Sequence, residues 1–167
     1  PHSANSMSST DPRAIATKAR LGDALIRLCL QRPLASVSVT ALCGEAGVAR
    51  KTFYAHYDDV EALARERVSD ILMPIFDSIT DAELVLPERG GVIHHVLAGM
   101  SQDMGRVVEL HRAFPSELIL SVLHPVAVKL AVRMLALHGV EDEFLVAYLS
   151  TSAAALALSG FRTWMAR

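Results

Sequence analysis

The stretch "SVTALCGEAGVARKTFYAHYDD", residues 38–59, decides how this chain folds. Ser38 stands before an apolar stripe at helical spacing, and a serine in that place is a preferred N-cap. Gly47 follows the stripe, at the position where a left-handed glycine commonly ends a helix. The pattern predicts a short helix whose inward face is formed by Val39, Leu42, Cys43 and Ala46.

A second short helix follows the glycine and covers about Arg50 to Tyr57. At about 100° per residue, Phe53 and Tyr57 point toward the preceding helices. Val48 supplies the apolar contact that often follows a helix-ending glycine. The predicted core of this second helix is therefore Val48, Phe53 and Tyr57.

Polar side chains occupy the other faces of the second helix and are expected to face outward. Two short helices joined by a tight glycine turn form a helix-turn-helix, whose second helix enters the major groove of DNA. Lysine and arginine bind guanine edges or phosphate, whereas tyrosine, threonine and histidine suit phosphate oxygens. The predicted DNA-contacting residues are Ser38, Thr40, Arg50, Lys51, Thr52, Tyr54 and His56.

The rest of the chain also carries helical patterns, and no segment alternates as a strand does. Thr10 or Asp11 before Pro12 predicts the start of a first helix, which ends before Pro33. The sequence therefore predicts an all-α chain. The later helices are expected at about 58–80 with a kink at Pro74, 88–113 with a weak point at Gly105, 116–138 with a kink at Pro125, and 141–165.

Charge is distributed unevenly, although the formal net charge is only −2. Residues 1–57 carry seven Lys/Arg and three Asp/Glu, a net +4, whereas residues 58–167 carry nine and fifteen, a net −6. This asymmetry indicates a basic head that contacts a polyanion and an acidic body that does not.

Residues 38–63, "SVTALCGEAGVARKTFYAHYDDVEAL", resemble the DNA-binding segment of the tetracycline-repressor (TetR) family of bacterial transcription regulators. The resemblance covers about residues 13–66 specifically. It implies a dimeric repressor that leaves its operator, a double-stranded DNA site, when a small molecule binds the C-terminal body. Two departures stand out: Ala49 replaces the usual serine-type helix cap, and Val60 replaces a phosphate-binding lysine, for which Lys18 or Arg20 is expected to compensate.

We expect the chain to divide into three parts. Residues 1–10 are expected to be a vector remnant and disordered N-terminus, 11–57 the helix-turn-helix domain, and 58–167 a continuous helical ligand-binding and dimerisation domain. Pockets in helical bundles are mostly apolar, so the expected effector is small and largely hydrophobic. The candidate pocket residues are Met73, Phe76, Met100, Met104, His111, Phe114, Ser121 and His124.

The stretch from Phe144 to Phe161 contains no charged residue. Its length nearly suits a membrane span, but its alanines and hydroxyl residues favour a helix buried in a bundle or at a subunit interface. We therefore expect a homodimer built on the last two helices and no membrane partner. Cys29 and Cys43, the only cysteines, favour a reducing cytoplasm and a reduced core pair over a redox switch.

Other classes of function have little support in the sequence. The scattered histidines lack the spacing of a metal site, and no nucleophile motif, phosphate loop or dinucleotide fingerprint is present. We expect no metal, no cofactor and no enzymatic activity. The alternative to a repressor is a helical protein-interaction module of the same fold that has lost operator binding through Ala49 and Val60.

Overall fold

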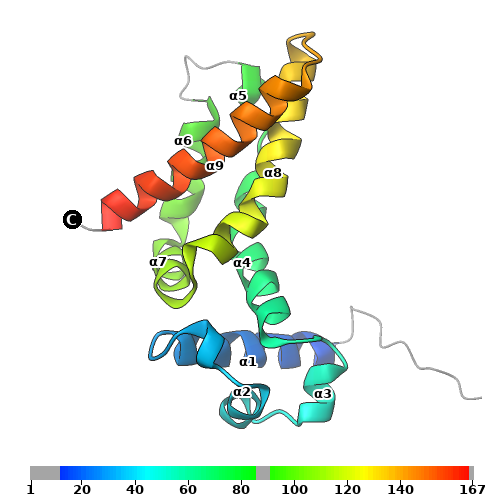
Figure 1. Cartoon of the computed structure of the whole chain (residues 1–167), viewed down its shortest axis with the longest axis vertical. Helices are drawn as coiled ribbons and strands as arrows, with labels where there is room; N and C mark the ends of the chain where they lie inside the picture. The colour runs from blue at the N-terminus through cyan, green and yellow to red at the C-terminus, as the bar shows by residue number, and fades with distance from the viewer. Residues whose placement is uncertain (1–11, 86–90, 166–167) are drawn as a thin grey trace, which may run out of the picture. The chain divides into compact units, whose positions relative to one another are not determined.

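The computed structural model of the chain describes residues 12–85 and 91–165, and every regular element in those ranges is helical (Figure 1). The all-α prediction is therefore confirmed for this part of the chain. The expected vector remnant, the cap at Thr10 or Asp11 and the expected helix start near residue 88 lie outside the described residues. The chain forms two compact units, the first ending at Arg67 and the second beginning at Val68.

The first unit contains α1 (Pro12–Cys29), the 3₁₀ turn η1 (Leu34–Ser36), α2 (Val39–Ala46), α3 (Arg50–Tyr54) and the first two turns of α4 (Val60–Asp77). Its elements share one apolar core. The side chains at its centre are at most 2% exposed and come from α1, α2, α3 and α4 in turn: Leu21, Leu25, Leu42, Phe53 and Leu63.

One helix of this unit is shorter than the sequence predicts. The first helix ends at Cys29, before Pro33 as expected, whereas the second helix of the motif ends at Tyr54 instead of Tyr57. Beyond Tyr54 the chain tightens, since the His56 amide donates to the Phe53 carbonyl, three residues back, at 2.9 Å. Asp59 then caps α4 by accepting from the Ala62 amide at 2.7 Å.

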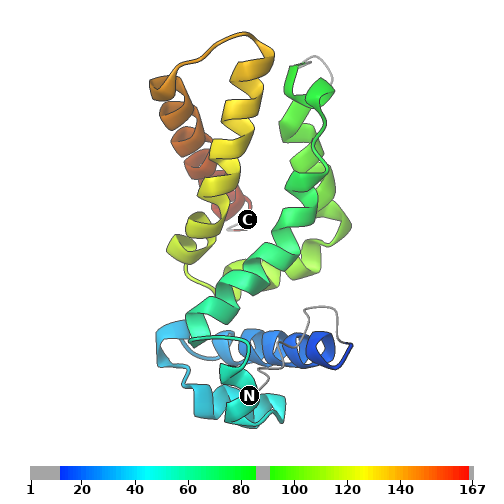
Figure 2. The ribbon, with the colours of Figure 1, turned by 90° about the vertical axis from the view of Figure 1, so that its right-hand side faces the viewer.

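Within residues 68–85 and 91–165, the second unit contains the rest of α4 and five further helices. These are α5 (Asp81–Val85), α6 (Gly91–Gln102), α7 (Met104–Ala113), α8 (Ser116–Leu137) and α9 (Glu143–Met165). Helices α8 and α9 run side by side and antiparallel, as Figures 1 and 2 both show, and make the most extensive helix pairing of the described elements. The core side chains of α7 and α8 include Val107, Leu110 and Ile119, each at most 1% exposed.

The expected helix over 88–113 is divided in the structure. Helix α6 ends at Gln102 and α7 begins at Met104, so the break lies at Asp103. The prediction of a weak point at Gly105 is wrong, because Gly105 lies inside the first turn of α7. Asp103 interrupts the helix through its own backbone, which has φ −135° and ψ 48°.

The fourth predicted helix also ends early, at Asp77 instead of about Thr80, and α5 follows it. Thr80 and Glu83 explain the new start. The Glu83 carboxylate accepts from the Thr80 amide at 2.8 Å, and the Thr80 hydroxyl accepts from the Glu83 amide at 3.4 Å. This reciprocal pair is a capping box, which stabilises a helix N-terminus.

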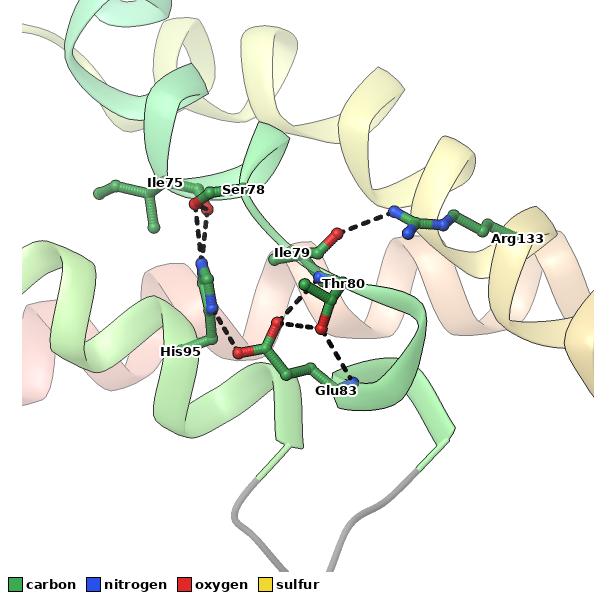
Figure 3. A network of polar contacts seen from close by, with 7 residues as sticks. All are labelled: Ile75, Ser78, Ile79, Thr80, Glu83, His95 and Arg133. Carbon is green, nitrogen blue, oxygen red and sulfur yellow. Dashed lines mark hydrogen bonds and ion pairs between the residues drawn. The ribbon is translucent and has the colours of Figure 1, made fainter.

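The same Glu83 carboxylate contacts His95 of α6 (Figure 3). His95 Nδ1 lies 2.7 Å from Glu83 Oε1, and Nε2 lies 3.1 Å from the Ile75 carbonyl oxygen and 2.9 Å from Ser78 Oγ. A carboxylate and a carbonyl oxygen only accept hydrogen bonds, so a ring protonated on both nitrogens satisfies both neighbours. His95 thus joins α6 to the end of α4 and to α5.

Two further contacts hold this junction together. Arg133 of α8 donates to the Ile79 carbonyl at 3.0 Å and to the Asp81 carboxylate at 2.6 Å (Figure 3 draws the first). Gly99 lets α6 lie close to α4, because a Cβ there would come within 2.7 Å of Ile75 Cγ2. The start of α5 is therefore fixed by side chains from two other helices, His95 of α6 and Arg133 of α8.

Candidate functional site

The turn between α2 and α3 has the geometry that its sequence predicts. Ser38 caps α2, since its hydroxyl oxygen accepts from the Ala41 amide at 3.2 Å. Gly47 ends α2 with left-handed backbone, at φ 61° and ψ 40°, and the Val48 amide donates back to the Cys43 carbonyl at 3.0 Å. Both predictions from local chemistry are confirmed.

Arg20 of α1 supports this turn from outside. Its Nη2 donates to the Ala46 carbonyl at 2.7 Å and to the Gly47 carbonyl at 2.8 Å, which satisfies two acceptors at the C-terminal end of α2. A Cβ on Gly47 would lie 2.9 Å from the same nitrogen. Gly47 is therefore required for its backbone angle and for the approach of Arg20.

Helix α3 docks on the first unit through the apolar side chains that the sequence predicts. Phe53 is fully buried, Tyr57 is 5% exposed and Val48 is half-buried. The Phe53 and Tyr57 ring centroids lie 5.6 Å apart, and the Tyr54 ring meets the Phe53 ring edge-on at 5.4 Å. Ala49 provides no side-chain cap, so the N-terminal end of α3 lacks one, as the departure at this position predicts.

Arg50, Lys51 and Tyr54 form an outward surface on α3, which we call the α3 surface. All three are exposed, and the Tyr54 side chain remains 52% accessible although its ring contacts Phe53. The structure gives neither the Arg50 side chain nor the Lys51 side chain a hydrogen bond or ion pair with any residue that it describes. Ser38 and Thr40, at the start of α2, are exposed as well.

The prediction that Thr52 and His56 face outward needs correction. Both are half-buried, and His56 Nε2 is buried without a hydrogen-bond partner. Since α3 ends at Tyr54, His56 does not occupy the position that a continuing helix would give it. Its ring instead lies 6.3 Å from the Tyr57 ring.

Other basic residues of the head differ from the α3 surface because they are engaged inside the first unit. Lys18 pairs with Glu66 at 3.1 Å, and Arg27 pairs with Glu45 at 2.9 Å. Lys18 and Arg20 are both committed to intramolecular partners. The expectation that one of them replaces the lysine missing at Val60 stays a prediction, and such a contact would compete with these intramolecular partners.

Glu66 lies at the centre of the contacts that follow α3. Its Oε1 accepts from the Tyr57 hydroxyl at 2.9 Å and from Lys18 Nζ at 3.1 Å. Lys18 Nζ also lies 5.4 Å from the centroid of the Tyr57 ring. Sequence reasoning missed this cluster, because 48 positions separate Lys18 from Glu66 and no local motif marks the pair.

The candidate pocket residues all lie in the second unit but differ in burial. Phe114 is buried, whereas Ser121 and His124 are exposed on α8, and the Ser121 hydroxyl donates to the Leu118 carbonyl at 2.7 Å. The half-buried candidates are Met73, Phe76, Met100, Met104 and His111.

His111 is half-buried, whereas the other polar candidates, Ser121 and His124, are exposed. Burial lowers the pKa of His111, and a hydrogen bond to the Val107 carbonyl at 3.0 Å opposes this effect in part. A carbonyl only accepts, so the neutral ring carries its proton on Nδ1.

The two cysteines are free and buried. Burial raises the pKa of the Cys29 thiol to about 11 and that of Cys43 in the same direction, so both are protonated at neutral pH. This state fits the reduced core pair.

Metal-binding clusters and membrane-spanning helices are the other kinds of feature to consider. The described residues include no group of three or more His, Cys, Asp or Glu side chains placed to hold a metal ion. In the same part of the chain, α8 is the one helix long and apolar enough to cross a membrane, by length and composition.

No family model and no curated protein matches this chain.

Proposed function

We propose that this chain is a DNA-binding transcription regulator in which α2 and α3 form a helix-turn-helix and α3 is the recognition helix. The observation that carries the proposal is the α3 surface: Arg50, Lys51 and Tyr54 are exposed, and the two cations have no intramolecular partner among the described residues. Phe53 and Tyr57 meanwhile hold the opposite side of the helix in the core.

The chemistry of this surface suits DNA. An α-helix fits the major groove, where lysine and arginine donate to guanine O6 and N7 or to phosphates. A tyrosine hydroxyl suits a phosphate oxygen. Lys18 and Arg27, which are also basic, are less available because each already pairs with a glutamate. Arg32 also has no partner for its Nε among the described residues but is half-buried, whereas Arg50 and Lys51 are exposed at the start of α3, the end of a recognition helix that contacts base edges.

The resemblance to the TetR family extends the proposal to a cytoplasmic homodimer built on α8 and α9. Support comes from the described side chains of α9: Phe144 and Tyr148 are 74% and 60% exposed, and their rings stack at 6.4 Å. Large aromatic side chains exposed together commonly mark an interface. A dimer also presents two α3 helices to a palindromic operator, about 34 Å or a multiple of it apart.

The same resemblance leads us to propose a repressor that a small, largely hydrophobic molecule releases from DNA. The effector would bind among the helices of the second unit. His111 would be its hydrogen-bonding partner, because it is half-buried whereas Ser121 and His124 are exposed. A hundredfold release requires the effector to favour the non-binding state by about 2.7 kcal/mol, which is within the usual range of coupling free energies.

A protein-interaction module is the second candidate function. The observation in its favour is on α6, where Ile93 and Leu97 are 74% and 60% exposed. They are four residues apart and so lie on the same face of the helix. This function needs no DNA, and it predicts that substitutions on α6 impair binding to a partner while the α3 surface is dispensable.

A selection experiment separates the two candidates. The purified chain is mixed with a pool of random-sequence duplexes, bound fragments are recovered over several rounds, and the enriched duplex is tested by gel shift. We expect one enriched sequence with internal symmetry. Its affinity should fall steeply as the salt concentration rises, because lysine and arginine side chains release counterions from the DNA phosphates when they bind. If no sequence is enriched at low salt, the DNA-binding proposal is wrong and the interaction module takes its place.

A further inference from the structure

We propose that Glu66 is a positioning residue for DNA recognition: its carboxylate holds the C-terminal end of α3 and so fixes the orientation of the α3 surface. This inference rests on the proposed function. Glu66 itself does not lie on α3 but in the second turn of α4. It acts through the hydroxyl of Tyr57.

One carboxylate joins three parts of the first unit. Glu66 Oε1 accepts from the Tyr57 hydroxyl at 2.9 Å, and its two oxygens lie 3.1 and 3.3 Å from Lys18 Nζ. Tyr57 follows α3, Lys18 belongs to α1 and Glu66 to α4. Hydrogen bonds with a charged partner are stronger than neutral ones, which suits a contact that fixes an orientation.

Helix α3 needs such an anchor because it is short. It has five residues and no side-chain cap at Ala49, and an isolated helix of that length does not form in water. Phe53 fixes its depth in the core, but one buried ring leaves rotation about that ring open. Tyr57 supplies a second fixed point, since its amide donates to the Phe53 carbonyl at 3.0 Å and its hydroxyl is bound by Glu66.

Lys18 makes the carboxylate compatible with DNA. An unpaired carboxylate near the recognition helix repels phosphates, whereas the Lys18–Glu66 pair has no net charge. The ammonium group also lies 5.4 Å from the Tyr57 ring centroid, within the range of a cation–π contact. Lys18 therefore contacts both partners of this hydrogen bond, the Glu66 carboxylate and the Tyr57 ring.

Hydrogen exchange tests the anchor without DNA. In Glu66→Ala, we expect amides of residues 53–57 to exchange about tenfold faster than in the wild type, because local opening becomes easier. Glu66→Gln keeps an oxygen that accepts from Tyr57 and should restore most of the protection. Glu61→Ala is the matched control, since it removes an exposed glutamate of the same helix whose ion pair is with Arg65.

Gel shifts then test recognition. The probes are the duplex enriched from the random pool and an unselected duplex of equal length. We expect Glu66→Ala to reduce the ratio of affinities for these two duplexes about tenfold, as for the loss of a contact worth about 1.4 kcal/mol. Tyr57→Phe, which removes only the hydroxyl, should act in the same direction. The double variant, Tyr57→Phe with Glu66→Ala, should have the same ratio of affinities as Glu66→Ala alone, because both changes remove the same hydrogen bond.

The outcomes separate this inference from the proposed function. Wild-type exchange rates in Glu66→Ala and Tyr57→Phe, or an unchanged affinity ratio in both, overturn the role of Glu66. A loss that Glu66→Gln does not restore also contradicts it. If the wild type enriches no duplex, the proposed function is wrong, and Glu66 then has no role in DNA recognition. The exchange rates still show whether Glu66 anchors α3.

Discussion

The guanidinium of Arg20 lies 2.8 Å from the carbonyl oxygen of Gly47, which ties α1 to the turn between α2 and α3. The Arg20 side chain also leaves no room for a side chain at position 47, because a Cβ on Gly47 would lie 2.9 Å from Arg20 Nη2. A single glycine therefore serves the backbone of the turn and its contact with the neighbouring helix.

Replacing Gly47 with alanine should destabilise the protein by about 1–2 kcal/mol, the usual cost of left-handed backbone for an L-residue. Gly44→Ala is a matched control in the same helix. Gly44 is exposed, a Cβ there meets nothing within 4 Å, and alanine favours the helix by roughly 0.5–1 kcal/mol. Urea unfolding of both variants measures the difference, and equal effects would contradict the role given to Gly47.

Ala49→Ser should stabilise the protein by about 1 kcal/mol. A serine hydroxyl can accept a hydrogen bond from an amide in the first turn of α3, whereas the alanine now at the N-cap cannot. The Ala49 backbone, at φ −68° and ψ 142°, already has the extended conformation of an N-cap. Urea unfolding measures the gain. Ala49→Gly serves as the comparison without a hydroxyl, and a serine variant no more stable than the glycine variant would refute the prediction.

Lys51→Ala and Tyr54→Phe should each weaken binding to the selected duplex by about 1–3 kcal/mol, and a lysine that contacts phosphate should also reduce the salt slope by about 1. Both residues belong to the exposed α3 surface. Arg65→Ala provides a control, because Arg65 is an exposed cation of α4 that pairs with Glu61. Gel shifts at several salt concentrations give the result. Equal losses in Lys51→Ala and Arg65→Ala would indicate a general charge effect instead of recognition.

The junction around Glu83 predicts a pH dependence of stability. The backbone hydrogen bond from Thr80, then the contact with His95, lower the pKa of Glu83 from 4.5 to about 2. A depressed folded-state pKa stabilises the protein above the unfolded-state pKa, and this contribution is lost as the pH falls toward 2. Wild type should therefore exceed Glu83→Gln in stability at pH 6, and the difference should shrink below about pH 4.5. Urea unfolding at several pH values tests this, and a constant difference would be inconsistent with it.

Tyr148→Glu should convert the proposed homodimer into monomers, since a buried unpaired carboxylate at an interface is costly. Ile93→Glu is the matched control: Ile93 is also an exposed apolar residue, 74% accessible, but lies on α6. Sedimentation at micromolar concentration distinguishes the two. A monomeric wild type would contradict the proposed homodimer. A dimer that is lost only in Ile93→Glu would place the interface on α6 instead of α9.

Local chemistry made much of the first unit predictable. The Ser38 cap and the Gly47 turn each depend on groups within five residues of one another, and the burial of Phe53 and Tyr57 follows from helical periodicity. The Thr80–Glu83 capping box has an equally local T-x-x-E pattern, but the sequence prediction ends a helix near Thr80 and begins none there. The end of α3 at Tyr54 was not readable, since the periodicity continues to Tyr57.

The sequence by itself determined the all-α class, the α2–α3 turn and the residues that dock α3. Only the tertiary structure decided which basic residues of the head remain available. In the sequence, Lys18 and Arg20 look as free as Arg50 and Lys51, because charge counting does not depend on partners. Folding brings Lys18 to Glu66, 48 positions away, and Arg20 to the Gly47 carbonyl, 27 positions away. Such pairs depend on how helices pack across the core, which no spacing along the chain specifies.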